Sequence, residues 1–300
     1  MKTPTTHLLD PAAVTKGEAL GLLARQIVEG YRVGEHRSPF HGFAIEFAQH
    51  REYGIGDDLK HLDWKLLGKT DRYYIKQYEQ DTNFIAHLLL DGSESMTYGS
   101  TDLTKLAYGK ILAACLAHII LQQRDAVALN VFDMQIREHI PRTDNPGKIH
   151  EIMQRLAAFS SEQATSLERA LRDVASMAKS RGIVIIISDL FDDEEAFQKG
   201  IERLRFQGSE VIVFHVLDPY ELEFPLTGTV KFIGLEGAPE LQTSPQAIRK
   251  SYLKEMGEFR QRMRRTCERS GCHYILANTG VPLSETLSEY LAFRQNARQR

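Results

Sequence analysis

Residues 85–96 read IAHLLLDGSESM, in which a run of apolar residues stops at an aspartate. The run suits a strand that is covered on both faces, as strands are in a parallel sheet. Asp91, Ser93 and Ser95 then follow in alternation, so three small oxygen-bearing side chains leave the end of one strand. The stretch predicts a buried strand with either a turn or a ligand site at its carboxyl end.

The chain after residue 83 alternates short β-rich runs with amphipathic segments, as a parallel α/β sheet requires. Strands are predicted at 84–90, 125–132, 183–188, 211–217, 229–235 (an edge strand) and 273–277, with 135–140 as an antiparallel companion. Helices are predicted at 103–123 (capped by Asp102), 148–159, 165–182, 193–206, 244–270 and 283–297. The predicted fold class is therefore α/β, a doubly wound, mostly parallel, Rossmann-like sheet.

The first 83 residues are predicted to form an N-terminal helix and β-rich extension, with the α/β domain at 84–300. A helix is expected over about 12–30, and two β segments, 43–53 and 72–79, flank the turn-rich stretch GIGDDLKHLDWK. Polar and aromatic residues in and before that stretch could form either an internal hydrogen-bond network or a partner surface. They are Arg51, Asp57, Asp58, His61, Asp63 and Trp64.

Composition narrows the class of protein. The 300 residues are 42% hydrophobic and 26% charged, which is ordinary globular usage. Lys plus Arg total 37 and Asp plus Glu total 40, so bulk charge gives no reason to expect a nucleic-acid partner. Three cysteines, Cys115, Cys267 and Cys272, fit reduced thiols, and no signal core or run of roughly 18 apolar residues is apparent. We expect a cytoplasmic protein without membrane insertion.

Oxygen-bearing side chains recur where strands end. Asp189 follows the strand 183–188 as Asp91 follows its own, and parallel sheets place ligand sites at the carboxyl ends of their strands. Thr165 begins a helix and can add a third hydroxyl to those of Ser93 and Ser95. Such a set suits Mg²⁺, or Mn²⁺ by the same preference for oxygen. The predicted metal ligands are thus Asp91, Ser93, Ser95, Thr165 and Asp189.

Three stretches, DGSESM (91–96), ATSLERAL (164–171) and IVIIISDL (183–190), resemble the three loops of a von Willebrand factor A domain. The resemblance implies a metal-ion-dependent adhesion site. Ser93 and Ser95 would then be direct ligands, with Thr165, Asp91 and Asp189 direct or through water. In this chain Gln163 and Ala164 stand where glycines usually precede the threonine.

The stretch HRSPFHGFAIEFAQHREYGIGDDLKHLDWK (36–65) resembles the signature of a bacterial family of unknown function whose members adjoin MoxR-type AAA+ ATPases. This resemblance implies an adaptor that works with such an ATPase in assembling or maturing protein complexes. The chain has no G-x-x-x-x-G-K-[ST] sequence, so the ATPase is expected to be the partner. We expect a non-enzymatic protein whose bound ion captures an Asp or Glu of a partner.

Two other functions stay open. One is a Mg²⁺-dependent hydrolase that uses Asp91 or Asp189, although no D-x-D or G-x-S-x-G pattern appears and His87 and His118 lie inside a predicted strand and helix. The other is a structural subunit that no longer binds metal.

Simpler structural roles also exist for each candidate group. Asp91, Ser93 and Ser95 could form a solvated turn that caps the next helix. The acids of 192–195 could cap a helix rather than bind metal. Cys267, Cys272 and His273 could be buried rather than ligate zinc, and the basic and aromatic residues of 72–78 could form a strand face.

Overall fold

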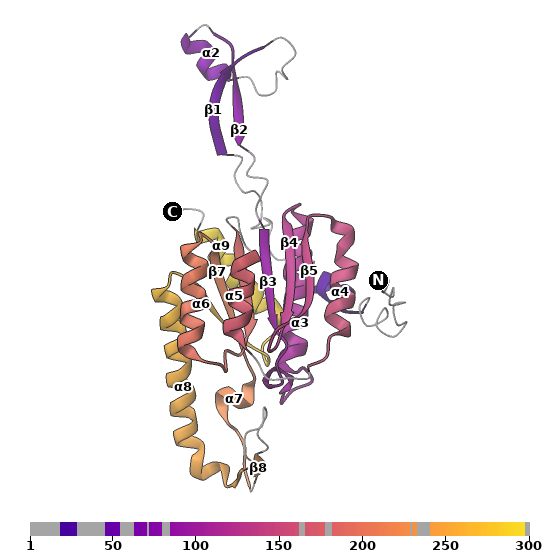
Figure 1. The fold of residues 1–300 in the computed structure, drawn as a ribbon, viewed down its shortest axis with the longest axis vertical. Coiled ribbons are helices and arrows are strands. Elements are labelled where there is room, and N and C mark those ends of the chain that lie inside the picture. The colour runs from indigo at the N-terminus through magenta and orange to yellow at the C-terminus, as the bar shows by residue number, and fades with distance from the viewer. Residues whose placement is uncertain are drawn as a thin grey trace, which may run out of the picture. The chain divides into compact units, whose positions relative to one another are not determined.

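The computed structural model describes residues 19–28, 46–54, 63–70, 72–79, 85–161, 166–177, 182–228, 230–232 and 241–297 (Figure 1). The chain divides into two compact units. One is Phe40–Asn83, and the other joins Met1–Pro39 to Phe84–Arg300. Six residues named in the sequence analysis lie outside the described residues: Asp57, Asp58, His61, Gln163, Ala164 and Thr165.

The smaller unit contains an antiparallel pair of strands, β1 (Glu46–Glu52) and β2 (Tyr74–Glu79). Both β segments were predicted, but the helix α2 (Trp64–Thr70) was not. Asp63 precedes α2, is 8% exposed and accepts a hydrogen bond from Leu66 N at 3.1 Å, so it acts as a helix cap. Trp64, in contrast, is 67% exposed, so this stretch supplies both an internal hydrogen bond and an exposed aromatic side chain.

A six-stranded sheet forms the centre of the larger unit, in the order β10-β7-β6-β3-β4-β5. Its strands are β3 (Ile85–Asp91), β4 (Ala126–Phe132), β5 (Ile136–Thr143), β6 (Ile183–Ser188), β7 (Glu210–Leu217) and β10 (His273–Asn278). Only β5 runs antiparallel to its neighbour in this sheet. The order reverses direction between β3 and β6, which confirms the predicted doubly wound, mostly parallel α/β fold.

Helices cover both faces of this sheet (Figure 1). They are α3 (Lys105–Gln122), α4 (Ile149–Ala158), α5 (Leu167–Met177), α6 (Glu194–Phe206), α8 (Pro245–Arg269) and α9 (Leu283–Ala297). Apolar side chains of α5, α6 and α8 share one core with alternate residues of β3, β6 and β7. All seven residues of β3 are buried, as the apolar run predicted. These helices confirm the predicted elements to within a few residues.

Helix α3 begins later than predicted. Its cap is Thr104, whose hydroxyl accepts a hydrogen bond from Ala107 N at 3.1 Å, and not Asp102. Leu103, the first residue of the predicted helix, is 37% exposed and precedes α3. The segment Ala19–Val28 is also helical, and Cys115 Sγ donates to Ala24 O at 3.8 Å, so this N-terminal helix packs on α3.

Helix α3 has the length and apolar composition of a membrane span, contrary to the prediction that no stretch approaches one. Its mean hydropathy over 18 residues is 1.2, and 78% of that window is buried within the fold. A helix that is apolar on nearly every side is also what the centre of a large α/β unit requires.

Of the predicted edge strand 229–235, the described residues Val230–Phe232 do form a strand, but it lies outside the six-stranded sheet. This strand, β8 (Val230–Phe232), pairs with β9 (Leu241–Thr243) in a separate two-stranded ribbon. The place beside β7 is taken instead by β10. A short helix, α7 (Pro219–Glu223), that the sequence reading missed follows β7 directly.

Candidate metal centre

Asp91 and Asp189 meet at the carboxyl edge of the sheet, because β3 and β6 are neighbours and Leu90 lies opposite Ile187. Ser188 Oγ, at the end of β6, donates to Asp91 Oδ2 at 2.6 Å. Both carboxylates are 0% exposed. The predicted meeting of the two strand ends is therefore observed.

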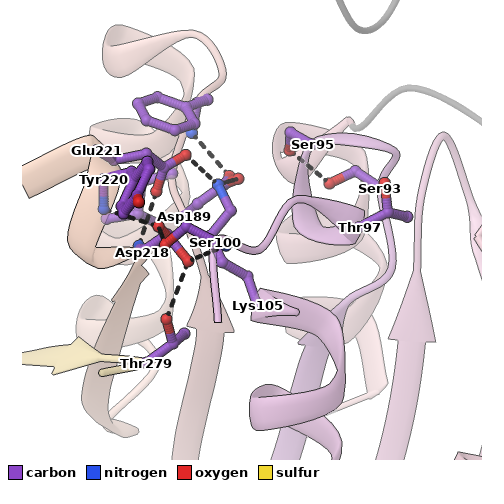
Figure 2. Close-up of polar contacts among 12 residues, drawn as sticks. Ser93, Ser95, Thr97, Ser100, Lys105, Asp189, Asp218, Tyr220, Glu221 and Thr279 are labelled. Atoms are coloured by element: carbon purple, nitrogen blue, oxygen red, sulfur yellow. Dashed lines mark hydrogen bonds and ion pairs between the residues drawn. The ribbon is translucent and has the colours of Figure 1, made fainter. Parts of the chain in front are cut away.

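Ser93 and Ser95 lie beside Asp91 in the loop that follows β3. Ser93 N donates to Asp91 Oδ1 at 3.0 Å, which is the local hydrogen bond of a turn. The Oγ atoms of Ser93 and Ser95 are 3.0 Å apart (Figure 2). Ser93 is fully buried and Ser95 partly buried, which does not fit the solvated turn considered above.

A glycine is needed at position 92 for this loop to form. A Cβ atom there would lie 2.4 Å from the ring of Phe159 and 3.2 Å from Val131. Gly92 N donates to Phe132 O at 2.7 Å, which holds the loop against β4. The backbone can therefore turn sharply beside Phe159 and bring both serines to the sheet edge.

The oxygen atoms present fit a hard divalent cation. In an octahedral Mg²⁺ site with bonds of about 2.1 Å, neighbouring ligand oxygens lie about 3.0 Å apart. The two serine hydroxyls, which hydrogen-bond to each other, have this separation. No group of three or more His, Cys, Asp or Glu side chains occurs among the described residues, so a closed zinc site is not seen in that part of the chain. Ser93, Ser95 and Asp91 would hold the ion.

The surroundings of Asp91 disfavour the ionised form of its carboxyl group. Burial, followed by repulsion from Asp189, raises the pKa of Asp91 to about 7, although hydrogen bonds from Ser188 and Ser93 lower it. A cation at this edge would favour the ionised carboxylate. The electrostatics of the site therefore agree with the fit of its oxygen atoms.

Lys105 supplies a fixed positive charge that the sequence reading missed. Its Nζ donates to Asp189 Oδ2 at 2.8 Å and to Glu221 Oε1 at 2.7 Å, and its side chain is 1% exposed. The ammonium also lies 4.9 Å from the ring centre of Phe191. Burial disfavours the ammonium, but attraction and hydrogen bonds from the two carboxylates outweigh it and raise the pKa of Lys105. Asp189 thus already has a cationic partner.

A second polar cluster surrounds Asp218, the cap of α7 (Figure 2). Its carboxylate accepts from Ser100 N at 2.8 Å, Ser100 Oγ at 2.5 Å, Tyr220 N at 2.8 Å and Thr279 Oγ1 at 3.4 Å. Glu221 completes a capping box by accepting from Asp218 N at 2.8 Å. The sequence D-P-Y-E (218–221) carries this signal, with proline in the first turn.

The predicted ligand Thr165 lies outside the described residues and stays a prediction. The described start of α5 reaches the same sheet edge, because Ser166 N donates to Asp133 O at 3.0 Å and Leu167 N to Asp192 Oδ2 at 2.6 Å. Asp193 caps α6 through Glu195 N and Ala196 N. Asp193 therefore caps α6, as the capping alternative predicted, whereas Asp192 accepts from the start of another helix, α5.

The remaining candidates have structural roles. Cys267 and Cys272 are buried free thiols, and burial raises the pKa of Cys272 to about 11, which does not favour a zinc-binding thiolate. His87 lies buried in β3 and His118 lies in α3, as predicted. His215, on β7, hydrogen-bonds through Nε2 to Asp189 O at 2.9 Å and through Nδ1 to Tyr274 Oη at 2.7 Å.

Solved structures with a similar fold have low sequence identity to this chain. BatB from Bacteroides thetaiotaomicron is 17% identical with a TM-score of 0.46, over 71% of this chain and 99% of that one. An aerotolerance-related membrane protein from Bacteroides fragilis is 17% identical with a TM-score of 0.48 over the same shares. The VWA domain of SpRpn10 is 14% identical with a TM-score of 0.42, over 69% of this chain and 94% of that domain.

Sequence relatives extend over nearly the whole chain. The uncharacterized proteins Rv1480 of Mycobacterium tuberculosis and Mb1516 of Mycobacterium bovis are each 21% identical over 291 residues, 95% of this chain and 91% of each relative. Residues 49–262 match the family described as Protein of unknown function DUF58. The match covers more than half of the chain and includes both strand ends of the candidate site, and the chain belongs to this family.

Proposed function

We propose that this protein is a cytoplasmic, non-enzymatic adaptor that binds partner proteins through a metal ion. The observation that carries the proposal is the pair of hydroxyls of Ser93 and Ser95, 3.0 Å apart beside the buried Asp91. Mg²⁺, or Mn²⁺, bound there would offer a coordination position to an Asp or Glu of the partner. A MoxR-type AAA+ ATPase is the proposed co-worker, in assembly or maturation of protein complexes.

The charges around the site support capture of an anion. Asp91, Asp189 and Glu221 carry three negative charges when ionised, and Lys105 contributes one positive charge. Asp218, beside Glu221, adds a further negative charge when ionised. Lys105 and a divalent ion together would offset three of these charges, so Lys105 would weaken the repulsion between the protein's own carboxylates and a partner's carboxylate.

Exposed aromatic side chains beside Lys105 support a protein partner. Tyr98, Phe191 and Tyr220, here called the aromatic rim, are 37%, 36% and 38% exposed. The ring centres of Tyr98 and Phe191 lie 6.0 and 4.9 Å from Lys105 Nζ, and Tyr220 N donates to Asp218 (Figure 2). Aromatic side chains are enriched in protein interfaces relative to the rest of the protein surface.

The test is metal binding and partner capture by a double variant, Ser93→Ala with Ser95→Ala. Calorimetry with Mg²⁺ should show binding to the wild type and none to the double variant. Thr97→Val is the matched control, because Thr97 lies in the same turn but its hydroxyl donates to Glu94 O at 2.6 Å. A tagged wild-type chain should retain its cognate MoxR-type ATPase in Mg²⁺ and release it in chelator.

Three results would contradict the proposal. They are ATPase capture that is the same with and without chelator, equal Mg²⁺ binding by wild type and double variant, and Mg²⁺-dependent phosphoester hydrolysis that Asp91→Ala removes. The last result would favour the hydrolase instead.

A further inference from the structure

A basic groove lies between helix α8 and the edge strand β10, apart from the ion-binding loop. Its volume is about 570 Å³. It is lined by Gly257, Arg260, Gln261, Arg264, Arg265 and Glu268 of α8 and by Tyr274 and Leu276 of β10. We call it the arginine groove.

One wall of the arginine groove is the open side of the sheet. β10 is the last strand in the order and pairs with β7, and Thr279 N donates to Leu217 O at 2.9 Å. The backbone N–H and C=O groups of successive residues point to opposite sides of a strand. Because the N–H group of Thr279 points toward β7, the backbone groups of Tyr274 and Leu276 point away from β7. The described part of the chain contains no strand on that outer side. The same two residues thus supply both groove-lining side chains and outward backbone groups.

The other wall carries an excess of positive charge. Three arginines face one acid, Glu268, which accepts a hydrogen bond from Arg264 Nε at 2.8 Å. Arginine side chains bind carboxylates through two parallel hydrogen bonds. The wall therefore favours an acidic occupant.

Gly257 leaves space at one end of the groove. A Cβ atom at this position would meet nothing within 4 Å. Glycine weakens a helix interior relative to alanine, and the described residues give no packing reason for it in the middle of α8. The absent side chain lets another backbone approach the helix closely.

We propose that the arginine groove binds an extended acidic segment of a partner protein, which adds as a strand along β10 and places its carboxylates against the arginines of α8. Backbone hydrogen bonds to β10 would give affinity, and the arginines would select acidic sequences. This surface is separate from the serine hydroxyls of the ion site, so its occupant does not need a metal ion.

The direct test is fluorescence anisotropy with the full chain and a labelled peptide of alternating Glu and Val, about eight residues long. This peptide should bind in chelator, and binding should weaken as salt rises. A Lys–Val peptide of the same length should not bind. Peptide binding in chelator would test the arginine groove independently of the proposed function, because only the proposed function requires the metal ion.

Two variants locate the binding. Arg260→Glu with Arg265→Glu should weaken the Glu–Val peptide at least about tenfold, because it reverses two charges. Gly257→Leu should weaken it without a change of charge. Arg169→Glu with Arg172→Glu, an equal change on the exposed face of α5, should have no effect. Circular dichroism confirms folding, and Arg260→Gln with Arg265→Gln replaces the reversal if that variant unfolds.

Other outcomes would overturn the proposal. Peptide binding that neither groove variant changes would place the peptide elsewhere. Binding of a single-stranded oligonucleotide, but not of the Glu–Val peptide, would assign the groove to nucleic acid. A dimer in sedimentation that Gly257→Leu abolishes, without peptide binding, would assign it to a second copy of the chain.

Discussion

Lys105 Nζ lies 2.8 Å from Asp189 Oδ2, and the two side chains are 1% and 0% exposed. One end of α3 and the end of β6 are thus joined by a fully buried ion pair, which Glu221 extends to α7. A buried pair contributes little net stability, but the loss of one partner leaves the other charged and buried. The Lys105–Asp189 pair therefore fixes the arrangement of the sheet edge.

Lys105→Met should destabilise the protein by about 3–5 kcal/mol, because the buried Asp189 and the partly buried Glu221 lose their cation. Urea unfolding at neutral pH measures the change. The triple variant with Asp189→Asn and Glu221→Gln should recover much of the loss. Equal stability of Lys105→Met and wild type would show that the ion pair does not form.

Asp91 should make the metal-free protein less stable as the pH rises. Burial and repulsion from Asp189 raise the pKa of Asp91 from 3.8 to about 7 in the folded protein. The unfolded chain therefore loses this proton at a lower pH than the folded protein does. As a result, the free energy of unfolding falls as the pH rises from 3.8 to about 7 and is constant above that. The loss is on the order of 4 kcal/mol. Urea unfolding in chelator at pH 5 and pH 8 measures it as the difference between the wild type and Asp91→Asn, because His215 acts in the opposite direction in both proteins.

Mg²⁺ should restore the stability of the wild type at alkaline pH, since the ion favours the carboxylate. Mg²⁺ should not change the stability of the Asp91→Asn variant. A wild type that Mg²⁺ leaves unchanged at pH 8 would contradict an ion at this edge.

His215 should make the protein sensitive to acid. Burial lowers the pKa of His215 from 6.5 to about 4 in the folded protein. The unfolded chain therefore takes up this proton at a higher pH than the folded protein does. As a result, the free energy of unfolding falls as the pH falls from 6.5 to about 4. The contribution is about 3 kcal/mol. His215→Gln, which can still donate toward Asp189 O, should reduce the slope of stability against pH over this range. An unchanged slope would mean that other groups control the acid response.

Gly92 and Gly257 should respond oppositely to alanine. Gly92→Ala should cost about 1–3 kcal/mol, because the new Cβ meets the ring of Phe159, and Phe159→Ala should recover part of that loss. Gly257→Ala should stabilise α8 by about 1 kcal/mol, because its Cβ meets nothing. Thermal unfolding of the three variants measures both effects, and loss of stability in Gly257→Ala would show a hidden contact.

The sequence predicts the parts of the fold that depend on local pattern. Apolar runs locate the central strands, and the aspartates that end two of them, Asp91 and Asp189, do meet because their strands are neighbours. Strand pairing at the edge is not local. Both 229–235 and 273–277 are predicted as strands, but only the second, as β10, joins the six-stranded sheet, and hydrophobic period alone does not tell which strands pair.

The candidate site was predicted in part for a similar reason. Asp91, Ser93 and Ser95 are close in sequence and lie together. Lys105 was missed because a lysine at a helix start is usually solvated, and only the folded chain brings two carboxylates to it. Glu221 was detectable as part of a capping box, but its bond to Lys105 spans 116 residues.

The contact between His215 and Tyr274 has a direction. Asp189 O can only accept a hydrogen bond, so the imidazole carries its proton on Nε2, and Nδ1 must accept from the Tyr274 hydroxyl. An imidazolium would donate from both nitrogens, so the Tyr274 hydroxyl would then accept from Nδ1 and direct its own hydrogen elsewhere. Tyr274 also lines the arginine groove. The two hydrogen bonds of His215 thus link the groove wall to the strand end that carries Asp189, and protonation of the imidazole would reverse the direction of the bond to Tyr274.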